Sequence, residues 1–193
     1  MPILFINPIH KNITLSLNEW WELLEKNTIE SWKDFDTFPE MLYSLIQWRK
    51  PEQIWVILWP WTFTRMRIVT LTLSTLVLSL WIKVRWCHFF ELIDDGIPLL
   101  QANREEYITL WEDANIIFLK KESLRPGTYI WYGDKNDFTG NKNFIEYTEN
   151  WEKIEKIFTW IWATSVLSPI YLKEPHITWS KKNMSLSWEK MKK

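Results

Sequence analysis

Few side chains in this chain of 193 residues are of the types that carry nucleophilic or acid-base chemistry. There is one cysteine, Cys87, and the three histidines, His10, His88 and His176, lie far apart in the sequence. A small enzyme that pairs Cys87 with His10 or His176 is one hypothesis, since histidine titrates near neutral pH and can activate a thiol. Cys87 and His88 themselves are neighbours on a predicted strand, which directs them to opposite faces of a sheet.

Other patterns that could carry chemistry have structural explanations. Asp94 and Asp95 could form a pair of acid-base or metal-binding carboxylates, but they precede Gly96, and aspartate favours turns by bonding to its own backbone. We interpret this segment as a turn. The serines lack the G-x-S-x-G context of a nucleophile elbow, and the four glycines are not spaced as in phosphate-binding or dinucleotide-binding loops. We therefore predict no catalytic residue, no metal site and no cofactor.

Tryptophan is the unusual feature of the composition, with 16 residues in a chain that is 17% aromatic. Tryptophan and arginine dominate the hot spots of protein interfaces, and aromatic side chains beside basic ones also bind single-stranded nucleic acid by stacking. A domain of this size does not readily bury so many indoles, so we expect most of them to lie in the core and several to be partly exposed and to contact another macromolecule. The predicted binding residues are Trp55, Trp59, Trp61, Arg65, Arg67, Trp81, Arg85, Trp86, Trp131, Tyr132, Trp179 and Trp188.

Charge and cysteine content suggest a compartment and a class of partner. The net charge is -1, and the basic residues gather within 51–90 and 173–193, which is a weak signature for nucleic-acid binding. A single cysteine cannot form an internal disulfide, so a reducing compartment such as the cytoplasm is expected. The two uncharged stretches, 53–64 and 68–82, are each shorter than the roughly 20 apolar residues of a spanning helix. We predict no membrane insertion.

The hydrophobic periodicity predicts an α+β fold. Apolar residues at steps of three and four predict helices over 17–27, 39–50 and 150–162. Alternating apolar and polar residues predict a mostly antiparallel sheet over 53–147, in which 53–64 and 68–82 form two paired strands and 115–120, 128–132 and 144–147 form others. We expect one folded domain, with an N-terminal helical segment (1–52), a core of sheet and helix (53–172) and a Trp- and Lys-rich tail (173–193).

Three short windows resemble the lentiviral Vif accessory proteins. The first is Trp131-Tyr132 followed by Asp137-Phe138, Gly140 and Asn143, as in non-primate members. The others are the tail, with Trp179-Ser180 and Ser185-Leu186-Ser187-Trp188, and Arg65-Met66-Arg67-Ile68, which is similar to the N-terminal strand of that family.

The resemblance implies an adaptor whose aromatic and basic sheet surface captures a host cytidine deaminase and whose helix recruits a ubiquitin-ligase component. Two elements of the family are missing. The Ser-Leu-Gln box that docks the ligase has no counterpart, because the analogous place before Pro169 reads Ile157-Phe158-Thr159-Trp160-Ile161. The zinc-binding Cys and His residues of the primate members are also lacking, so recruitment of the ligase does not follow from the resemblance.

The leading hypothesis from the sequence is therefore a non-enzymatic protein-interaction module. It would be a viral accessory or adaptor protein that binds a host protein in the host-cell cytoplasm through a Trp-rich surface. The alternatives are a single-stranded nucleic-acid-binding protein that uses the aromatic and basic residues between 55 and 86, and a small enzyme of unknown class. A homo-oligomer is left open.

Overall fold

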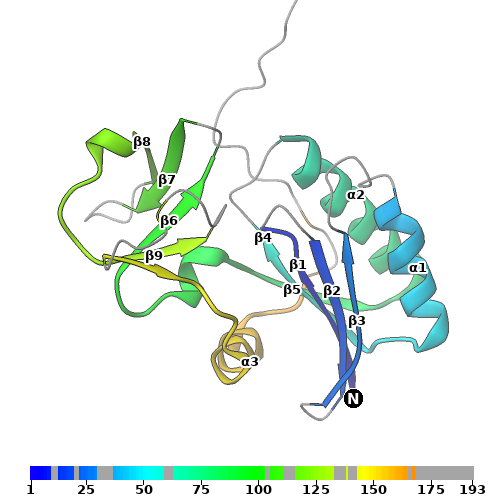
Figure 1. The fold of residues 1–193 in the computed structure, drawn as a ribbon. Coiled ribbons are helices and arrows are strands. Elements are labelled where there is room, and N and C mark those ends of the chain that lie inside the picture. Colours follow the sequence, from blue (N-terminus) through cyan, green and yellow to red (C-terminus); the bar gives the residue numbers. More distant parts are fainter. Residues whose placement is uncertain are drawn as a thin grey trace, which may run out of the picture.

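The computed structural model describes residues 1–9, 13–19, 22–29, 37–58, 63–102, 105–110, 116–132, 138, 143–164 and 167, with the backbone alone at 63–66. These residues form two five-stranded sheets and three α-helices, one of which, α3 (Trp151–Trp160), lies between the sheets (Figure 1). We call the sheet formed by the N-terminal strands sheet A and the other one sheet B.

Sheet A has the strand order β3-β2-β1-β4-β5. Its strands β1, β4 and β5 run parallel to one another, and β2 and β3 form antiparallel ladders at the side of β1. Parallel strands must be covered on both faces, which explains the almost unbroken apolar sequences of β1 and β4. The strands are β1 (Pro2–Asn7), β2 (Ile13–Glu19), β3 (Glu22–Ile29), β4 (Gln53–Leu58) and β5 (Lys83–His88).

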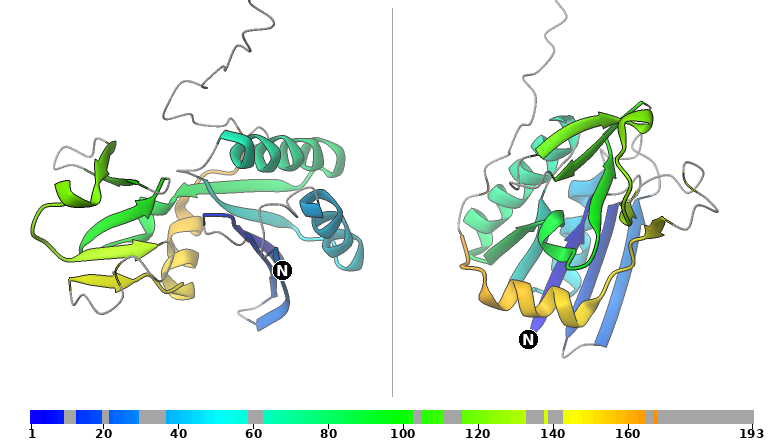
Figure 2. Two further views of the ribbon diagram at one scale, coloured as in Figure 1. Left: turned by 45° about the horizontal axis from the view of Figure 1, so that its top comes forward. Right: turned by 90° about the vertical axis from the view of Figure 1, so that its left-hand side faces the viewer.

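Helices cover both faces of sheet A. The helices α1 (Phe38–Trp48) and α2 (Phe63–Leu80) pack on one face, and α3 lies across the strands on the other (Figure 2). Pro39 stands in the first turn of α1, where its missing N–H costs no hydrogen bond. Asn150 caps α3 by accepting a hydrogen bond from the backbone N–H of Lys153 at 3.1 Å.

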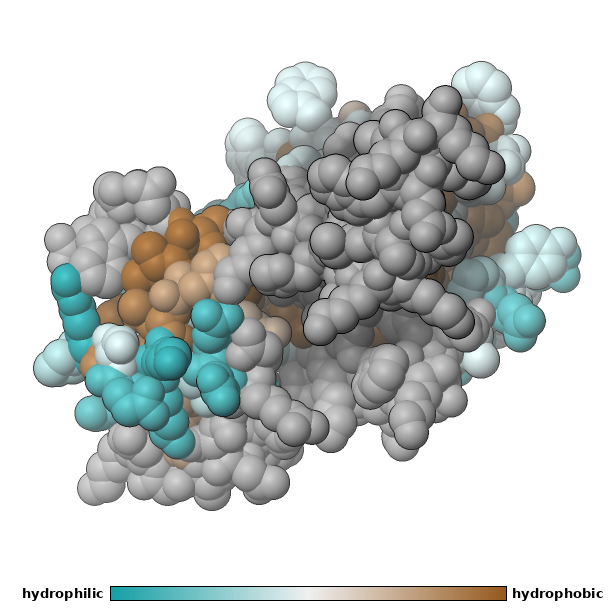
Figure 3. Space-filling model, turned by 90° about the horizontal axis from the view of Figure 1, so that it is seen from above, coloured by the Kyte–Doolittle hydropathy of each residue, from teal (hydrophilic) through white to brown (hydrophobic). Residues whose placement is uncertain are grey.

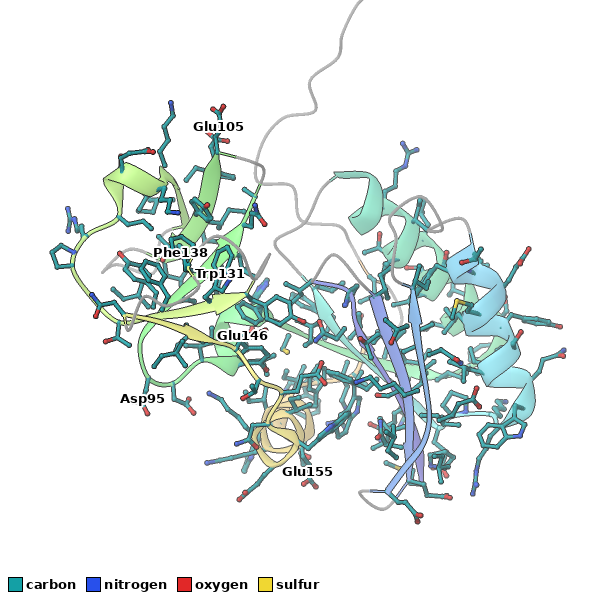
Figure 4. All side chains as sticks on the ribbon, viewed as in Figure 1. Asp95, Glu105, Trp131, Phe138, Glu146 and Glu155 are labelled. Atoms are coloured by element: carbon teal, nitrogen blue, oxygen red, sulfur yellow. The ribbon has the colours of Figure 1, made fainter. Side chains whose placement is uncertain are left out.

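Sheet B follows from β5 through the short 3₁₀ helix η2 (Phe89–Leu92) and has the order β10-β9-β6-β7-β8. Its core is aromatic, and Trp131 and Phe138 meet edge to face with ring centroids 4.7 Å apart (Figure 4). The apolar surface at this end of the molecule is bordered by hydrophilic side chains (Figure 3). The strands are β6 (Ile97–Gln101), β7 (Glu106–Leu110), β8 (Ile116–Lys120), β9 (Tyr129–Tyr132) and β10 (Phe144–Glu146), and the 3₁₀ helix η3 (Lys121–Ser123) follows β8.

The structure confirms the α+β class, the helices predicted over 39–50 and 150–162, and the strands predicted at 115–120, 128–132 and 144–147. The turn at Asp94 to Gly96 is also confirmed, and Gly96 adopts a φ of 102°, which residues with a Cβ rarely reach. The prediction of a mostly antiparallel sheet is wrong. Among the described residues, four strand pairs are parallel and four are antiparallel. In sheet A, α1 connects β3 to β4 and α2 connects β4 to β5, and such helical connections allow β4 and β5 to run parallel to β1.

The helix predicted over 17–27 is also wrong, since its described residues belong to β2 and β3. The apparent capping box at Ser16 lies inside β2, where the Ser16 hydroxyl and carbonyl accept hydrogen bonds from the Asn18 amide instead. β2 pairs with β1 along its length, and this long-range pairing overrides the local helical signal.

The strand predicted over 68–82 is a helix, α2, except at its last residues. Val69, Leu73 and Val77 recur every four residues and are buried against sheet A. The hydroxyl residues that suggested a two-residue period bond back within the helix instead: Thr75 donates to the carbonyl of Leu71 at 2.9 Å. No helix among the described residues is both long and apolar enough to cross a membrane.

Substitutions in α2 distinguish the helix from a strand. Leu73 is fully buried whereas Leu71 is 57% exposed, although both would share one face of a strand. We expect Leu73→Ala to lower the free energy of unfolding by about 2 to 5 kcal/mol and Leu71→Ala by less than about 0.5 kcal/mol. Urea denaturation followed by circular dichroism measures both changes, and equal losses would contradict the helical assignment.

Candidate functional site

The parallel strands β1, β4 and β5 end at one edge of sheet A, at Asn7, Leu58 and His88. The connection that follows β1 leads to β2, on one side of β1. The connection that follows β4 leads to β5, on the opposite side, so the two connections diverge between β1 and β4. Ligands of open α/β sheets bind outside the carboxyl ends of the strands at such a divergence. We therefore take this carboxyl edge of sheet A as the candidate site.

A polar network occupies the carboxyl edge. The Asn7 side chain is 2% exposed, and its Nδ2 donates one hydrogen bond to Glu149 Oε1 at 2.6 Å and a longer one to the Tyr132 hydroxyl at 3.4 Å. Its Oδ1 accepts from the backbone N–H of Ile9 at 3.3 Å, which fixes the turn that follows β1. Tyr132 and Glu149, which are 125 and 142 positions away from Asn7 in the sequence, thus meet Asn7 at the end of β1.

Three aromatic rings enclose this network. Phe89, at the start of η2, lies 5.3 Å from the Tyr132 ring and 5.0 Å from the Tyr147 ring, and the two tyrosine rings are 5.4 Å apart. Tyr132 ends β9 and Tyr147 follows β10, so sheet B supplies one wall of the site. A carboxylate beside phenols in a partly apolar enclosure can accept and donate protons with little interference from bulk water.

Burial and the Glu149 carboxylate raise the pKa of Tyr132 well above its usual value, and the hydrogen bond from Asn7 offsets only part of that effect. The pKa of Tyr147 is raised by the same two causes, burial first. Both phenols are therefore neutral at physiological pH and can act as hydrogen-bond donors.

Cys87 and His88 are neighbours on β5 and therefore lie on opposite faces of sheet A. Cys87 is buried, and burial raises the pKa of its thiol, so it stays protonated and is a poor nucleophile. Burial lowers the pKa of His88, and the nearby Glu91 carboxylate acts in the other direction. The backbone N–H of His88 donates to Glu91 Oε1 at 2.9 Å. His10 and His176, the proposed partners of Cys87, lie outside the described residues.

Within the described part of the chain, no three His, Cys, Asp or Glu side chains are placed to hold a metal ion. The groups that the structure does bring together at the carboxyl edge are one carboxylate, one amide and two phenols. A carboxylate can accept a proton and a phenol can donate a hydrogen bond, and the amide can orient the carboxylate.

Of the predicted binding residues that the structure describes, only Tyr132 lies in this network. Trp55 and Trp131 are buried in the core, Trp86 is half-buried, and Arg67 and Trp81 are exposed, Trp81 by 92%. Arg85 donates to the carbonyls of Phe158 and Thr159, at the end of α3, at 2.6 and 2.8 Å. The structure does not describe Trp59, Trp61, Trp179, Trp188 or the side chain of Arg65.

Sequence reasoning missed Asn7, Tyr147 and Glu149. None of them belongs to a recognisable motif. The rule that ligands bind at the carboxyl ends of parallel strands could have located them, but it requires the strand order of sheet A. The pattern of strand, helix and strand over 53–88 was the available signal, because it places parallel strand ends at one edge. That signal was lost when 68–82 was assigned to a strand.

No protein-family model matches the chain, and no curated protein matches it. Solved structures do match. YeaZ from Pseudomonas aeruginosa has a TM-score of 0.51 at 14% sequence identity over 69% of this chain and 75% of YeaZ. An uncharacterized protein with similarity to peptidase YEAZ from the same organism has a TM-score of 0.49 at 13% identity, over 65% and 69%. T. thermophilus RuvC in complex with Holliday junction substrate has 0.40 at 10% identity, over 48% and 67%.

The likeness to YeaZ is a likeness of fold. It contradicts the expectation of a non-enzymatic, virus-encoded accessory protein that acts on a host protein. The expectation relied on the excess of tryptophan as a sign of an interaction surface. Several indoles are exposed as predicted, among them Trp81, but Trp55 and Trp131 are buried in the core. The resemblance to the lentiviral Vif proteins is not tested by these comparisons and stays a prediction.

The buried thiol gives a simple prediction. We expect Cys87 in the native protein to resist modification by 5,5′-dithiobis(2-nitrobenzoate) at pH 8 and to react fully once guanidinium chloride unfolds the chain, because the reagent needs an accessible thiolate. The absorbance of the released thiolate measures the reaction. Rapid stoichiometric labelling of the native protein would contradict the burial of this side chain.

The raised pKa of Tyr132 predicts a loss of stability in alkali. The unfolded chain releases the phenolic proton near pH 10 while the folded protein retains it, so the free energy of unfolding falls as the pH rises above about 10. We expect Tyr132→Phe to reduce this slope in urea denaturations between pH 8 and 11. Tyr43→Phe, at an exposed position of α1, is the matched control. An unchanged slope in Tyr132→Phe would contradict the prediction.

Proposed function

We propose that this protein is an enzyme that catalyses a hydrolytic reaction at the carboxyl edge of sheet A, with Glu149 as the general base. The observation that carries the proposal is the 2.6 Å hydrogen bond from the buried Asn7 amide to Glu149 Oε1, at the place where the parallel strands end. A general base must be held in a fixed orientation, and Asn7 supplies that restraint from the most central strand of the sheet.

The proposed roles follow from the contacts. Because Asn7 binds Oε1, Oε2 of Glu149 is the oxygen that takes a proton from a water molecule. The hydroxide then adds to an acyl or phosphoryl centre of the substrate, and the proton passes from Glu149 to the leaving group as the bond to that group breaks. Tyr132 and Tyr147 are neutral donors beside Glu149, and they are suited to stabilising the negative charge that develops on the substrate oxygen.

The chain shares its fold with YeaZ, and its own parallel strands β1, β4 and β5 end together at the proposed site. The compartment that we propose is the cytoplasm, because the one cysteine is a buried, protonated thiol that needs no oxidising surroundings. Of the two alternatives left open by the sequence, nucleic-acid binding loses two of its groups among the described residues: Trp55 is buried, and Arg85 is engaged by the end of α3.

The test compares Glu149→Gln with Glu152→Gln, an exposed carboxylate three residues further on in α3. Hydrolysis of p-nitrophenyl acetate and of p-nitrophenyl phosphate serves as the probe. We expect Glu149→Gln to lower kcat/KM at least about 100-fold, because it keeps the shape of the side chain and removes the base. Glu152→Gln should change it less than about twofold, within the range of a neutral surface substitution.

A separate variant tests the restraint on Glu149. Asn7→Ala should lower kcat more than it raises KM, since it removes the group that orients the base rather than a substrate contact. If Glu149→Gln and wild type hydrolyse the probes at the same rate, or if wild type does not exceed buffer, the assignment of Glu149 as general base is wrong.

A further inference from the structure

A cavity lies on the face of sheet A that carries α3. None of the residues of the candidate site at the carboxyl edge lines it. Its volume is about 310 Å3, which is at the lower end of the range for small-molecule sites. Strands of sheet A form its floor and α3 one wall. Among the lining residues are Ile3, Asn18, Trp55, Trp151, Glu155 and Thr159.

Two indole rings of this cavity are held rigidly. Trp55 stacks on Phe158 with centroids 5.1 Å apart and planes within 7°, and its Nε1 donates to Gln53 Oε1 at 3.1 Å. Trp151 meets Phe5 edge to face at 4.8 Å. Rings that are fixed before a ligand arrives lose little freedom when it binds, so these two walls are already organised.

Asn18 and Glu155 offer acceptor oxygens to a ligand in the cavity, and the hydroxyl of Thr159 can donate or accept. Asn18 is 9% exposed, and its Nδ2 donates to the carbonyl and the hydroxyl of Ser16, so its Oδ1 is the group left for a ligand. Glu155 projects from α3 (Figure 4), and none of the ion pairs formed between described residues includes it. No lysine, arginine or histidine is among the described residues that line the cavity. Met1 does line it, and its N-terminal ammonium is paired with Glu19 Oε1 at 3.4 Å.

We propose that this cavity binds a small organic cation of the arylalkylammonium or alkylammonium class. The faces of indole rings attract a cation through their quadrupoles, and more strongly where water is excluded. Glu155 supplies the countercharge, and Asn18 Oδ1 accepts a hydrogen bond from an ammonium N–H. An anion of the same shape would be repelled by Glu155, and a neutral molecule would gain from the apolar walls alone.

This site does not rest on the proposed hydrolytic function, because Asn7, Tyr132, Tyr147 and Glu149 are all outside its lining. The two proposals therefore fail separately. Loss of hydrolysis in Glu149→Gln does not bear on the cavity, and loss of cation binding in Glu155→Gln does not bear on the carboxyl edge.

Isothermal titration calorimetry of the full chain with three probes of similar shape tests the proposal. Phenethylammonium is the cation, 2-phenylethanol its neutral counterpart and 3-phenylpropionate the anion. We expect phenethylammonium to bind at least tenfold more tightly than 2-phenylethanol, with no detectable binding of the anion. Equal affinity for the cation and the alcohol, or no binding of the cation at millimolar concentration, would overturn the proposal.

Variants then locate the bound cation. Glu155→Gln should weaken phenethylammonium about tenfold and leave 2-phenylethanol unchanged, whereas Glu152→Gln, an exposed carboxylate on the same helix, should change neither. Trp151→Leu should weaken both probes. Glu155 is only partly buried, so Glu155→Gln is expected to fold, and its circular dichroism spectrum and Tm verify this. An unchanged affinity for the cation in Glu155→Gln would overturn the assignment of this carboxylate as the countercharge.

Discussion

The three parallel strands of sheet A require cover on both faces, and this requirement shapes the rest of the molecule. Parallel strands joined by helices bury nearly all their side chains, and β1 and β4 accordingly read as runs of apolar residues. Two helices cover one face. The other face has α3, which at ten residues is about 15 Å long, less than the roughly 19 Å between the outer strands of a five-stranded sheet. The cavity beside Trp55 and Trp151 lies along this helix, between it and the strands that it leaves partly uncovered.

Periodicity alone located the elements whose apolar residues follow a single period. The helices α1 and α3 each bury one stripe, as Ile154 and Phe158 do in α3, and they were predicted almost to their ends. The helix α2 was not, because its Thr and Ser residues alternate with apolar ones in two-residue steps while its buried residues, such as Val69 and Leu73, recur every four. A sequence that satisfies both periods cannot be assigned from the pattern alone.

The candidate site could not be predicted in the same way, because long-range pairing creates it. Asn7 and Glu149 are 142 positions apart, and they meet only because β9 and β10 of sheet B place the segment before α3 against the end of β1. Asparagine and glutamate are common surface residues, so neither their type nor their spacing suggests a site. The tryptophans misled for the opposite reason. They are rare and attract a functional interpretation, yet Trp55 and Trp131 serve the core.

The contacts of α3 have a mechanical consequence. Arg85 of β5 donates to the carbonyls at the end of α3, and Lys153 in its first turn pairs with Asp94, in the turn before sheet B, at 2.5 Å. One helix is thus tethered to both sheets, and Glu149 lies two residues before its first turn. A rotation of one sheet against the other would therefore displace this carboxylate. The contacts of Arg85 and Lys153 limit how far Glu149 moves during thermal motion.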